Sequence, residues 1–371
     1  MKTKSLLLSL ILVVGVLAFN SCSKEDDPAP LTQENAELAI EDASTDFEAT
    51  STDLLANDGF ALQEQLYDMY LPFYNTKKVS KRTFGNVDVE ALKKNASNYF
   101  NLSKREYFEF HFNYLFDIYF EGSTGTWEWN GEEFVKTSDL PADQIVAKFP
   151  YNSETNNATL RYYDYKYNSD YEEMTGLKCE IKVGTEVKLL IVYSASYSGS
   201  MTSFSMSHKY DATFGVFNYV ENMSFSGSGS ETSSKININA SGTLKKSGEV
   251  KFGQSVNFII NATQQIANFV YDARLRISNL ELRLKMAFAS DEAEIIFNSE
   301  SDPNEYLQMS IYTAGGAKIG DFKYNKVEGE WIPYFVYSDG TEVSAEQALG
   351  MLYGRMDYFM GDLFDLMYDF K

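Results

Sequence analysis

Cysteine, histidine and tryptophan are scarce in this chain of 371 residues, which contains two, two and three of them. Two cysteines cannot form a disulfide scaffold, so we expect a hydrophobic core to hold the fold together. Neither His111 nor His208 has a catalytic partner at a useful spacing, and the chain contains no His-Glu-x-x-His motif. The apolar run at residues 6–19 is too short to span a bilayer. These absences argue against a disulfide-rich domain and against a zinc protease of the His-Glu-x-x-His type.

Aromatic and acidic residues are abundant. Hydrophobic residues make up 44% of the chain, which argues for a real core. The aromatic residues are 26 Tyr and 27 Phe, and both types suit half-buried pleated surfaces. Acidic side chains outnumber basic ones by 53 to 32, which gives a net charge of −21. Such a chain cannot neutralise a row of phosphates, so we expect no nucleic-acid partner.

The first 22 residues have the pattern of a processed export signal. Lys2 and Lys4 precede the apolar run, which ends in a small residue followed by Cys22. A cysteine in this position is where a lipoprotein is cut and lipidated. We therefore expect a cleaved signal peptide at residues 1–21 and a lipid-bearing Cys22, with acyl chains such as palmitate, anchoring a soluble body. The alternative is an ordinary secretory signal that happens to contain a cysteine. Cleavage would remove both lysines and change the net charge to −23.

Residues 22–31 are polar and contain two prolines, which predicts a solvated, flexible tether. The Ser-Cys ending of the signal resembles the looser lipobox of Bacteroidetes. Lys24, followed by three acidic residues, resembles the surface-export signal of lipoproteins from that group. These resemblances imply an outer-membrane location facing the cell exterior, whereas a tether with no further role is the simpler interpretation.

We expect a helical segment over residues 32–105. Thr32 can cap a first helix whose apolar residues recur at helical steps, namely Ala36, Ile40, Ala43, Phe47 and Leu54. A second helical piece lies between Gly59 and Pro72, with Leu62, Leu66, Met69 and Tyr70 on one face. A third short helix is expected over residues 88–100.

From about residue 106 the apolar period changes to two, which predicts strands. A two-residue turn at Asn130-Gly131 and another at Gly184-Thr185 would join hairpins. Shorter strands are expected at residues 108–114, 204–206, 214–216, 236–238, 256–260 and 331–337. Turns are expected at residues 227–229, 247–248 and 339–340, and the glycine-rich residues 315–320 predict a turn rather than a phosphate loop.

Residues 266–288 allow two interpretations. Apolar residues alternate up to Ile277 and again from Leu280, but a helical spacing also fits part of the segment. The change of parity across residues 278–279 favours a hairpin, because both apolar sets then lie on one sheet face. Such a hairpin would gather four basic residues on its polar face: Arg274, Arg276, Arg283 and Lys285.

This basic group also has two interpretations. In so acidic a chain, it could form a site for an anionic glycan or a lipid headgroup. The simpler interpretation, which we favour from the sequence alone, is a solvated face in which Asp272 and Glu281 pair with the cations and contribute little.

Residues 344–370 carry the clearest helical pattern. Ser344 and Gln347 form a capping box, and a continuous apolar stripe follows. Because a sheet with one apolar face needs a cover, we expect this helix to pack on the sheet. The alternatives are docking on a partner or a membrane, and an apolar pocket beneath the helix. That pocket would be lined by Leu352, Met356, Phe359, Met360 and Leu363.

We find no catalytic motif. The nucleophile elbow, the P-loop and the dinucleotide fingerprint are all missing. Cys179 lies on the apolar side of its strand, where burial would make it inert. The acidic groups at residues 172–173 and 291–294 match no EF-hand loop, and solvated faces account for them better. We therefore expect a protein that is not an enzyme and has no metal or cofactor.

Several blocks resemble one protein family. They are residues 125–130, 145–150, 157–160, 301–306, 319–321 and 337–341, the last leading into the C-terminal helix. The set resembles a recurring pattern in uncharacterised outer-membrane and surface lipoproteins of Bacteroidetes. The resemblance implies the location and the architecture, and it brings no catalytic residues.

The sequence thus predicts an α+β fold with N-terminal helices, a large curved antiparallel β-meander and a C-terminal amphipathic helix packed on the sheet. Its domains would be a signal peptide (1–21), a tether (22–31), a helical segment (32–105) and a β domain (106–371) ending in the helix at 344–370. The expected function is a non-catalytic binding or scaffold module, anchored in the outer membrane and holding a lipid or glycan ligand. The alternative is a carrier of an apolar ligand between sheet and helix, and a glycan-processing enzyme with two carboxylates is less favoured.

Overall fold

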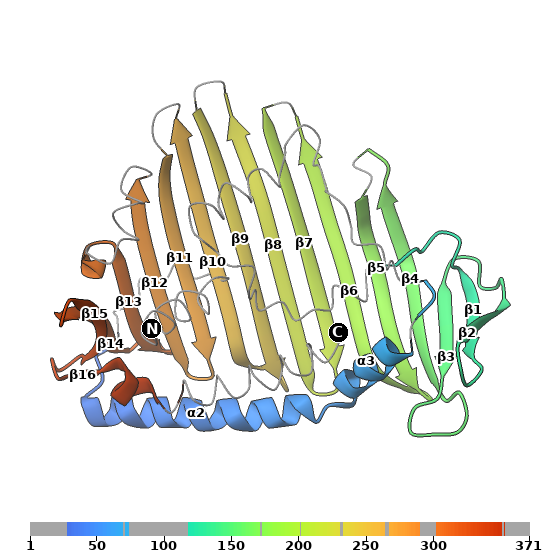
Figure 1. Cartoon of the computed structure of the whole chain (residues 1–371), viewed down its shortest axis with the longest axis horizontal. Coiled ribbons are helices and arrows are strands. Elements are labelled where there is room, and N and C mark those ends of the chain that lie inside the picture. Colours follow the sequence, from blue (N-terminus) through green and yellow to red (C-terminus); the bar gives the residue numbers. More distant parts are fainter. Residues whose placement is uncertain are drawn as a thin grey trace. The chain divides into compact units, whose positions relative to one another are not determined.

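The computed structural model describes residues 28–69, 71–73, 118–170, 173–200, 202–230, 233–263, 267–289, 302–350 and 352. In this part of the chain, two helices precede sixteen strands that join one largely antiparallel sheet (Figure 1). The strands follow one another in chain order from β16 to β3, and β1 and β2 complete the row. This order confirms the predicted meander. The expected strand at 108–114 and helix at 88–100 lie outside the described residues.

The helices are α2 (Gln33–Leu55) and α3 (Asp58–Asp68), with a short 3-10 turn η2 (Pro303–Glu305). The strands are β1 (Gly125–Trp129), β2 (Phe134–Ser138), β3 (Ile145–Phe149), β4 (Ala158–Asn168), β5 (Glu173–Val183), β6 (Glu186–Gly199), β7 (Ser203–Phe214), β8 (Phe217–Gly229), β9 (Ser233–Lys246), β10 (Glu249–Thr263), β11 (Ala267–Ile277), β12 (Leu280–Ala289), β13 (Leu307–Thr313), β14 (Lys318–Val327), β15 (Glu330–Tyr337) and β16 (Glu342–Ser344).

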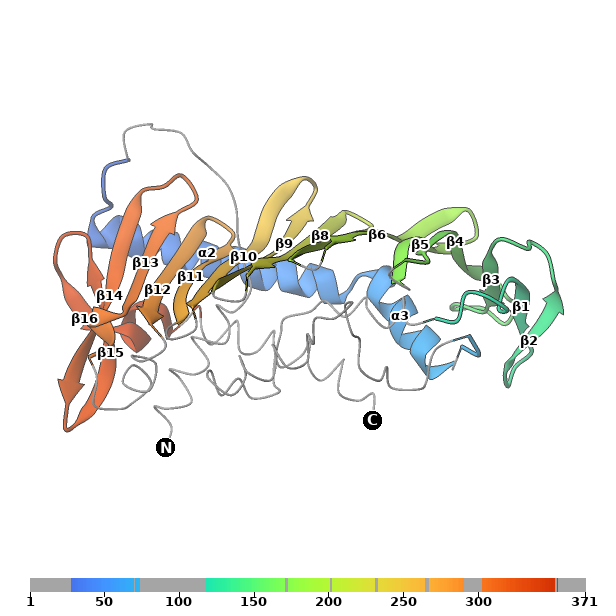
Figure 2. The same cartoon turned by 90° about the horizontal axis from the view of Figure 1, so that it is seen from above.

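The chain divides into two compact units. Unit 1 comprises Met1–Asp53, Thr202–Ser205 and Glu221–Lys371, and unit 2 comprises Leu54–Met201 and Met206–Val220. Within each unit, the sheet is not strongly curled when seen from above (Figure 2). This observation corrects the expectation of a curved sheet.

In unit 1, α2 lies along the hairpin turns at one end of the strands (Figures 1 and 2). Its buried stripe contains the five apolar residues predicted from the sequence, and the Thr32 hydroxyl accepts a 3.4 Å hydrogen bond from the Asn35 amide, as expected of a cap. Near its start, Leu31 donates its amide hydrogen to the Lys318 carbonyl over 3.0 Å. The helix is therefore attached both by apolar packing and by polar contacts to the hairpin ends.

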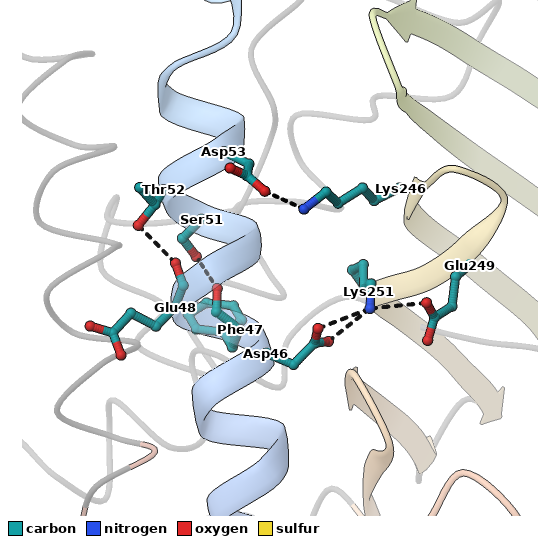
Figure 3. Close-up of polar contacts among 9 residues, drawn as sticks. All are labelled: Asp46, Phe47, Glu48, Ser51, Thr52, Asp53, Lys246, Glu249 and Lys251. Atoms are coloured by element: carbon teal, nitrogen blue, oxygen red, sulfur yellow. Dashed lines mark hydrogen bonds and ion pairs between the residues drawn. The ribbon is translucent and has the colours of Figure 1, made fainter.

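Two ion pairs hold α2 to the hairpin formed by β9 and β10 (Figure 3). Lys251 donates to both carboxylate oxygens of Asp46, at 2.9 and 3.1 Å, and also pairs with Glu249 at 3.0 Å. Asp53, further along the helix, pairs with Lys246. Burial by itself would raise the pKa of Asp46, but hydrogen bonds from Ser278 and Lys251 outweigh it and lower that pKa.

In unit 2, α3 is attached to the sheet through its first residues. Asp58 pairs with Lys188 of β6 at 2.8 Å and accepts a 3.3 Å hydrogen bond from the Tyr151 hydroxyl. Gln65 donates a hydrogen bond to the Pro150 carbonyl. The hydrogen bond from Lys188 lowers the pKa of Asp58. Because Asp58 is the first residue of α3, its negative charge lies at the helix N-terminus, where the helix dipole stabilises it.

The sheet departs from the predicted pattern in one pairing and three turns. β1 pairs with β3 in parallel, on the edge of β1 opposite to β2. Residues 130–133 all lie in the first turn, where the Asn130 side chain accepts from the amides of residues 132 and 133. Of the strand expected at 214–216, only Phe214 lies in a strand, at the end of β7, and residues 215–216 form a turn in which Gly215 has a φ of +58°. Gly227 lies inside β8, where the ring of Phe204 occupies the space that a side chain would need.

The C-terminal helix begins as predicted. Residues 345–350 are helical, and the Ser344 hydroxyl accepts a 3.0 Å hydrogen bond from the Gln347 amide, so Ser344 is the N-cap. Ala345, Leu349 and Leu352 are buried. The rest of the predicted helix lies outside the described residues.

Candidate functional site

The hairpin predicted at residues 266–288 is confirmed as β11 and β12, which turn at residues 278–279. Arg274 lies directly opposite Arg283, and Asp272 lies opposite Lys285. Alternate residues on the other face, including Ala273, Leu275 and Leu284, are buried. The hairpin therefore presents one apolar face and one face of mixed charge.

We define the basic cluster as Arg274, Arg276, Arg283 and Lys285. Its cations share two carboxylates. Glu281 contacts Arg283 at 2.6 Å and Arg274 at 3.7 Å, and Asp272 lies 3.9 Å from Arg274 and 4.0 Å from Lys285. These are the pairs that the simpler interpretation of the sequence expects.

Arg276 contacts the backbone of the hairpin turn. Its Nε atom donates a 3.1 Å hydrogen bond to the carbonyl of Ser278 in the hairpin turn. Arg276 thus fixes the turn, whereas Arg274, Arg283 and Lys285 remain around the two shared carboxylates.

The next strand adds an aromatic ring that sequence reasoning missed. The guanidinium of Arg283 lies over the ring of Tyr312 in β13, 4.0 Å from its centroid. Tyr312 lies opposite Glu281, and Ser310 lies opposite Arg283. Only the register between β12 and β13 brings this ring to the arginine, and no local sequence signal specifies that register.

The basic cluster is accessible and carries an excess of positive charge. Three of its cations, Arg274, Arg283 and Lys285, contact two carboxylates, in a chain whose net charge is −21. The side chain of Lys285 is 62% exposed, and that of Arg283 is 34% exposed. The group can therefore offer guanidinium and ammonium donors to an anion, alongside an aromatic ring.

A related group in unit 2 was not singled out from the sequence. Arg161 lies over the ring of Tyr163 at 4.1 Å and 3.8 Å from the carboxylate of Glu180. Lys178 lies over the same ring at 5.5 Å and pairs with Asp164 at 2.6 Å. Lys182 also pairs with Glu180, at 2.9 Å, so this group, like the basic cluster, has three cations around two carboxylates.

The other predicted site residues are only partly described. Leu352 is buried, whereas Cys22, Met356, Phe359, Met360 and Leu363 lie outside the described residues. Cys179 is completely buried, and this burial raises the pKa of its thiol, which disfavours the reactive thiolate.

Two absences hold for the described part of the chain. It contains no group of three or more His, Cys, Asp or Glu side chains placed to hold a metal ion. None of its helices is both long enough and apolar enough to cross a membrane.

The chain was compared with protein-family models, curated proteins and solved structures, and it matches none of them.

Proposed function

We propose that this chain is a lipid-anchored, outward-facing lipoprotein of the outer membrane, similar to the Bacteroidetes lipoproteins that its sequence blocks resemble, and that it acts as a non-catalytic binding module. The basic cluster supports the binding role, whereas Cys22 at the end of the export signal and Lys24 with the acidic residues after it support the anchor and the location. The basic cluster is an accessible group of cations in excess over its carboxylates, beside an aromatic ring, in a strongly acidic chain.

The ligand suited to this surface is anionic, and sulfate, carboxylate or phosphate groups all qualify. Guanidinium groups bind such oxyanions through paired hydrogen bonds, so Arg274 and Arg283 are the residues expected to contribute most. The acidic remainder of the chain repels anions. We therefore expect an anionic ligand to bind only where it reaches the basic cluster itself.

The test uses the soluble body, with Cys22 replaced by Ala and a cleavable signal in front. We expect it to bind dextran sulfate but not neutral dextran, with an affinity that falls as salt increases. The double variant R274Q/R283Q should bind at least fivefold more weakly. The matched control K323Q/K326Q removes two exposed lysines from β14 and should leave binding unchanged. Equal loss in both double variants, or no binding by the parent protein, would contradict the proposal.

The membrane anchor is tested separately. In the native host, an alkyne analogue of palmitate should label the full chain, and Cys22→Ala should abolish this labelling. Protease added to intact cells should degrade the protein if it faces outward. Labelling that persists in the C22A variant, or full protection from the protease, would contradict this part of the proposal.

A further inference from the structure

The segment just before α2 is attached to the turn between β13 and β14 of unit 1. The Leu31 amide donates to the Lys318 carbonyl over 3.0 Å. Pro28 lies against Gly316: the Cδ atom of Pro28 would be 3.6 Å from a Cβ atom added to this glycine. Gly316 has a φ of +89°. The chain therefore reaches unit 1 at this turn, before the first residue of α2.

Few residues separate this contact from Cys22. Six residues lead from Cys22 to Pro28. Because each residue of an extended chain spans at most about 3.3–3.6 Å, this stretch cannot exceed about 20 Å. A lipid on Cys22 would be held at the bilayer surface by its acyl chains.

We infer that the β13–β14 turn and the start of α2 form the membrane-proximal end of unit 1, with Gly316 within about 25 Å of the bilayer surface, because the contact with Pro28 adds a few ångströms to the length of the extended stretch. This inference rests on the proposed lipidation of Cys22. Tyr312 and the neighbouring Arg283 lie only a few residues along the strands from this turn, so the basic cluster also lies near the bilayer.

The test is energy transfer from single labelled cysteines to acceptor-labelled lipids, using the full lipidated protein in phosphatidylethanolamine–phosphatidylglycerol vesicles. Gly315→Cys places a donor at the turn, where a new side chain has its nearest neighbour at 3.7 Å. Ser234→Cys places the donor near the start of β9, about 40 Å along the strand from its helix-side end. Cys179 is buried and should not take up label.

We expect transfer from G315C to be at least twice that from S234C. A spacer of 20 Gly and Ser residues inserted between Asp26 and Asp27 should reduce transfer from G315C, because a flexible spacer of that length adds about 25 Å of mean reach. Transfer from G315C that does not exceed that from S234C, or that the spacer leaves unchanged, would overturn the inference. Absence of palmitate labelling in the chain that retains Cys22 would instead show that the proposed anchor is wrong.

Discussion

At the scale of single residues, close packing explains the glycine in one of the blocks singled out in the sequence. Gly320, in the block at residues 319–321, is buried in β14. A Cβ atom on this glycine would meet the Val336 carbonyl oxygen and would lie 2.7 Å from Cζ of Phe335. Gly320 is therefore required by the approach of β15.

Gly320→Ala should consequently lower the free energy of unfolding by about 1–3 kcal/mol, as overpacking usually does. Urea denaturation of the soluble body measures this loss. The matched control is Gly315→Ala at the exposed β13–β14 turn, where the nearest atom would be 3.7 Å away. It should change stability by no more than about 0.5 kcal/mol. Equal stability of the two variants would show that β15 does not crowd Gly320.

The hydrogen bonds of Asn304 give a structural role to a second block, at residues 301–306. Its side chain donates to the Tyr324 carbonyl and accepts from the Tyr324 amide, both over 2.8 Å, so it replaces a neighbouring strand at that point of β14. Asp302 orients Asn304 by accepting from its backbone amide over 2.9 Å. The sequence identifies the block at residues 301–306 as distinctive, but its structural role depends on a partner 20 residues away.

At the scale of elements, α2 depends on its contacts with the hairpins. Its 23 residues include five Ser or Thr, which have lower helix propensity than Ala or Leu. The buried apolar stripe and the ion pairs from Asp46 and Asp53 compensate for this weakness. The sequence predicts the stripe, whereas the lysines that meet the two aspartates come from a hairpin about 200 residues away.

The Asp46–Lys251 pair should make the attachment of α2 sensitive to acid. The pKa of Asp46 in the folded protein is lowered from its ordinary value of 3.8, so its contribution is complete above that pH and is lost as the pH falls through the lower folded value. Asp46→Asn should therefore cost about 1 kcal/mol at pH 7, because the pair is partly exposed and solvent screens it. The difference from the parent should disappear below the folded pKa.

Urea denaturation at pH values from 7 down to 2 measures this difference. Asp42→Asn is the matched control, because Asp42 is exposed on the same helix and its replacement should change stability little at any pH. A cost of D46N that stays constant down to pH 2 would mean that the ion pair is not the source of its effect.

At the scale of the whole molecule, one long strand in each unit has more buried residues toward its helix-side end than at its other end. In β10 of unit 1, residues 252 and 254–256 are buried, whereas Asn261 and Thr263 are exposed. In β6 of unit 2, Leu189 and Ile191 are buried, and residues 198–199 are exposed. In these two strands, the helix-side half therefore contributes more to the core.

This gradient predicts a gradient of local stability along each strand. In hydrogen exchange followed by mass spectrometry, peptides covering residues 250–256 and 187–193 should exchange more slowly than those covering 258–263 and 195–200. Peptides of the same strand differ in burial but share the same ladder of hydrogen bonds, so each strand supplies its own control. Equal exchange along β6 and β10 would contradict this gradient.

The sequence by itself determines where the helices begin, which residues alternate along the strands, and where several of the turns fall. The Ser344 cap, the stripe on α2 and the hairpin at residues 278–279 were all predicted, because caps, helical spacing and parity are local properties. The same locality limits what a single sequence can show.

Only the tertiary structure decides which strands are neighbours and in which register. It places β1 between β2 and β3, brings Tyr312 to Arg283, and attaches α2 to Lys246 and Lys251. Backbone hydrogen bonds between strands are alike for every residue type, so register follows from the packing of whole faces rather than from any local motif. For that reason the four basic residues could be predicted to share a face, whereas the aromatic ring beside them could not.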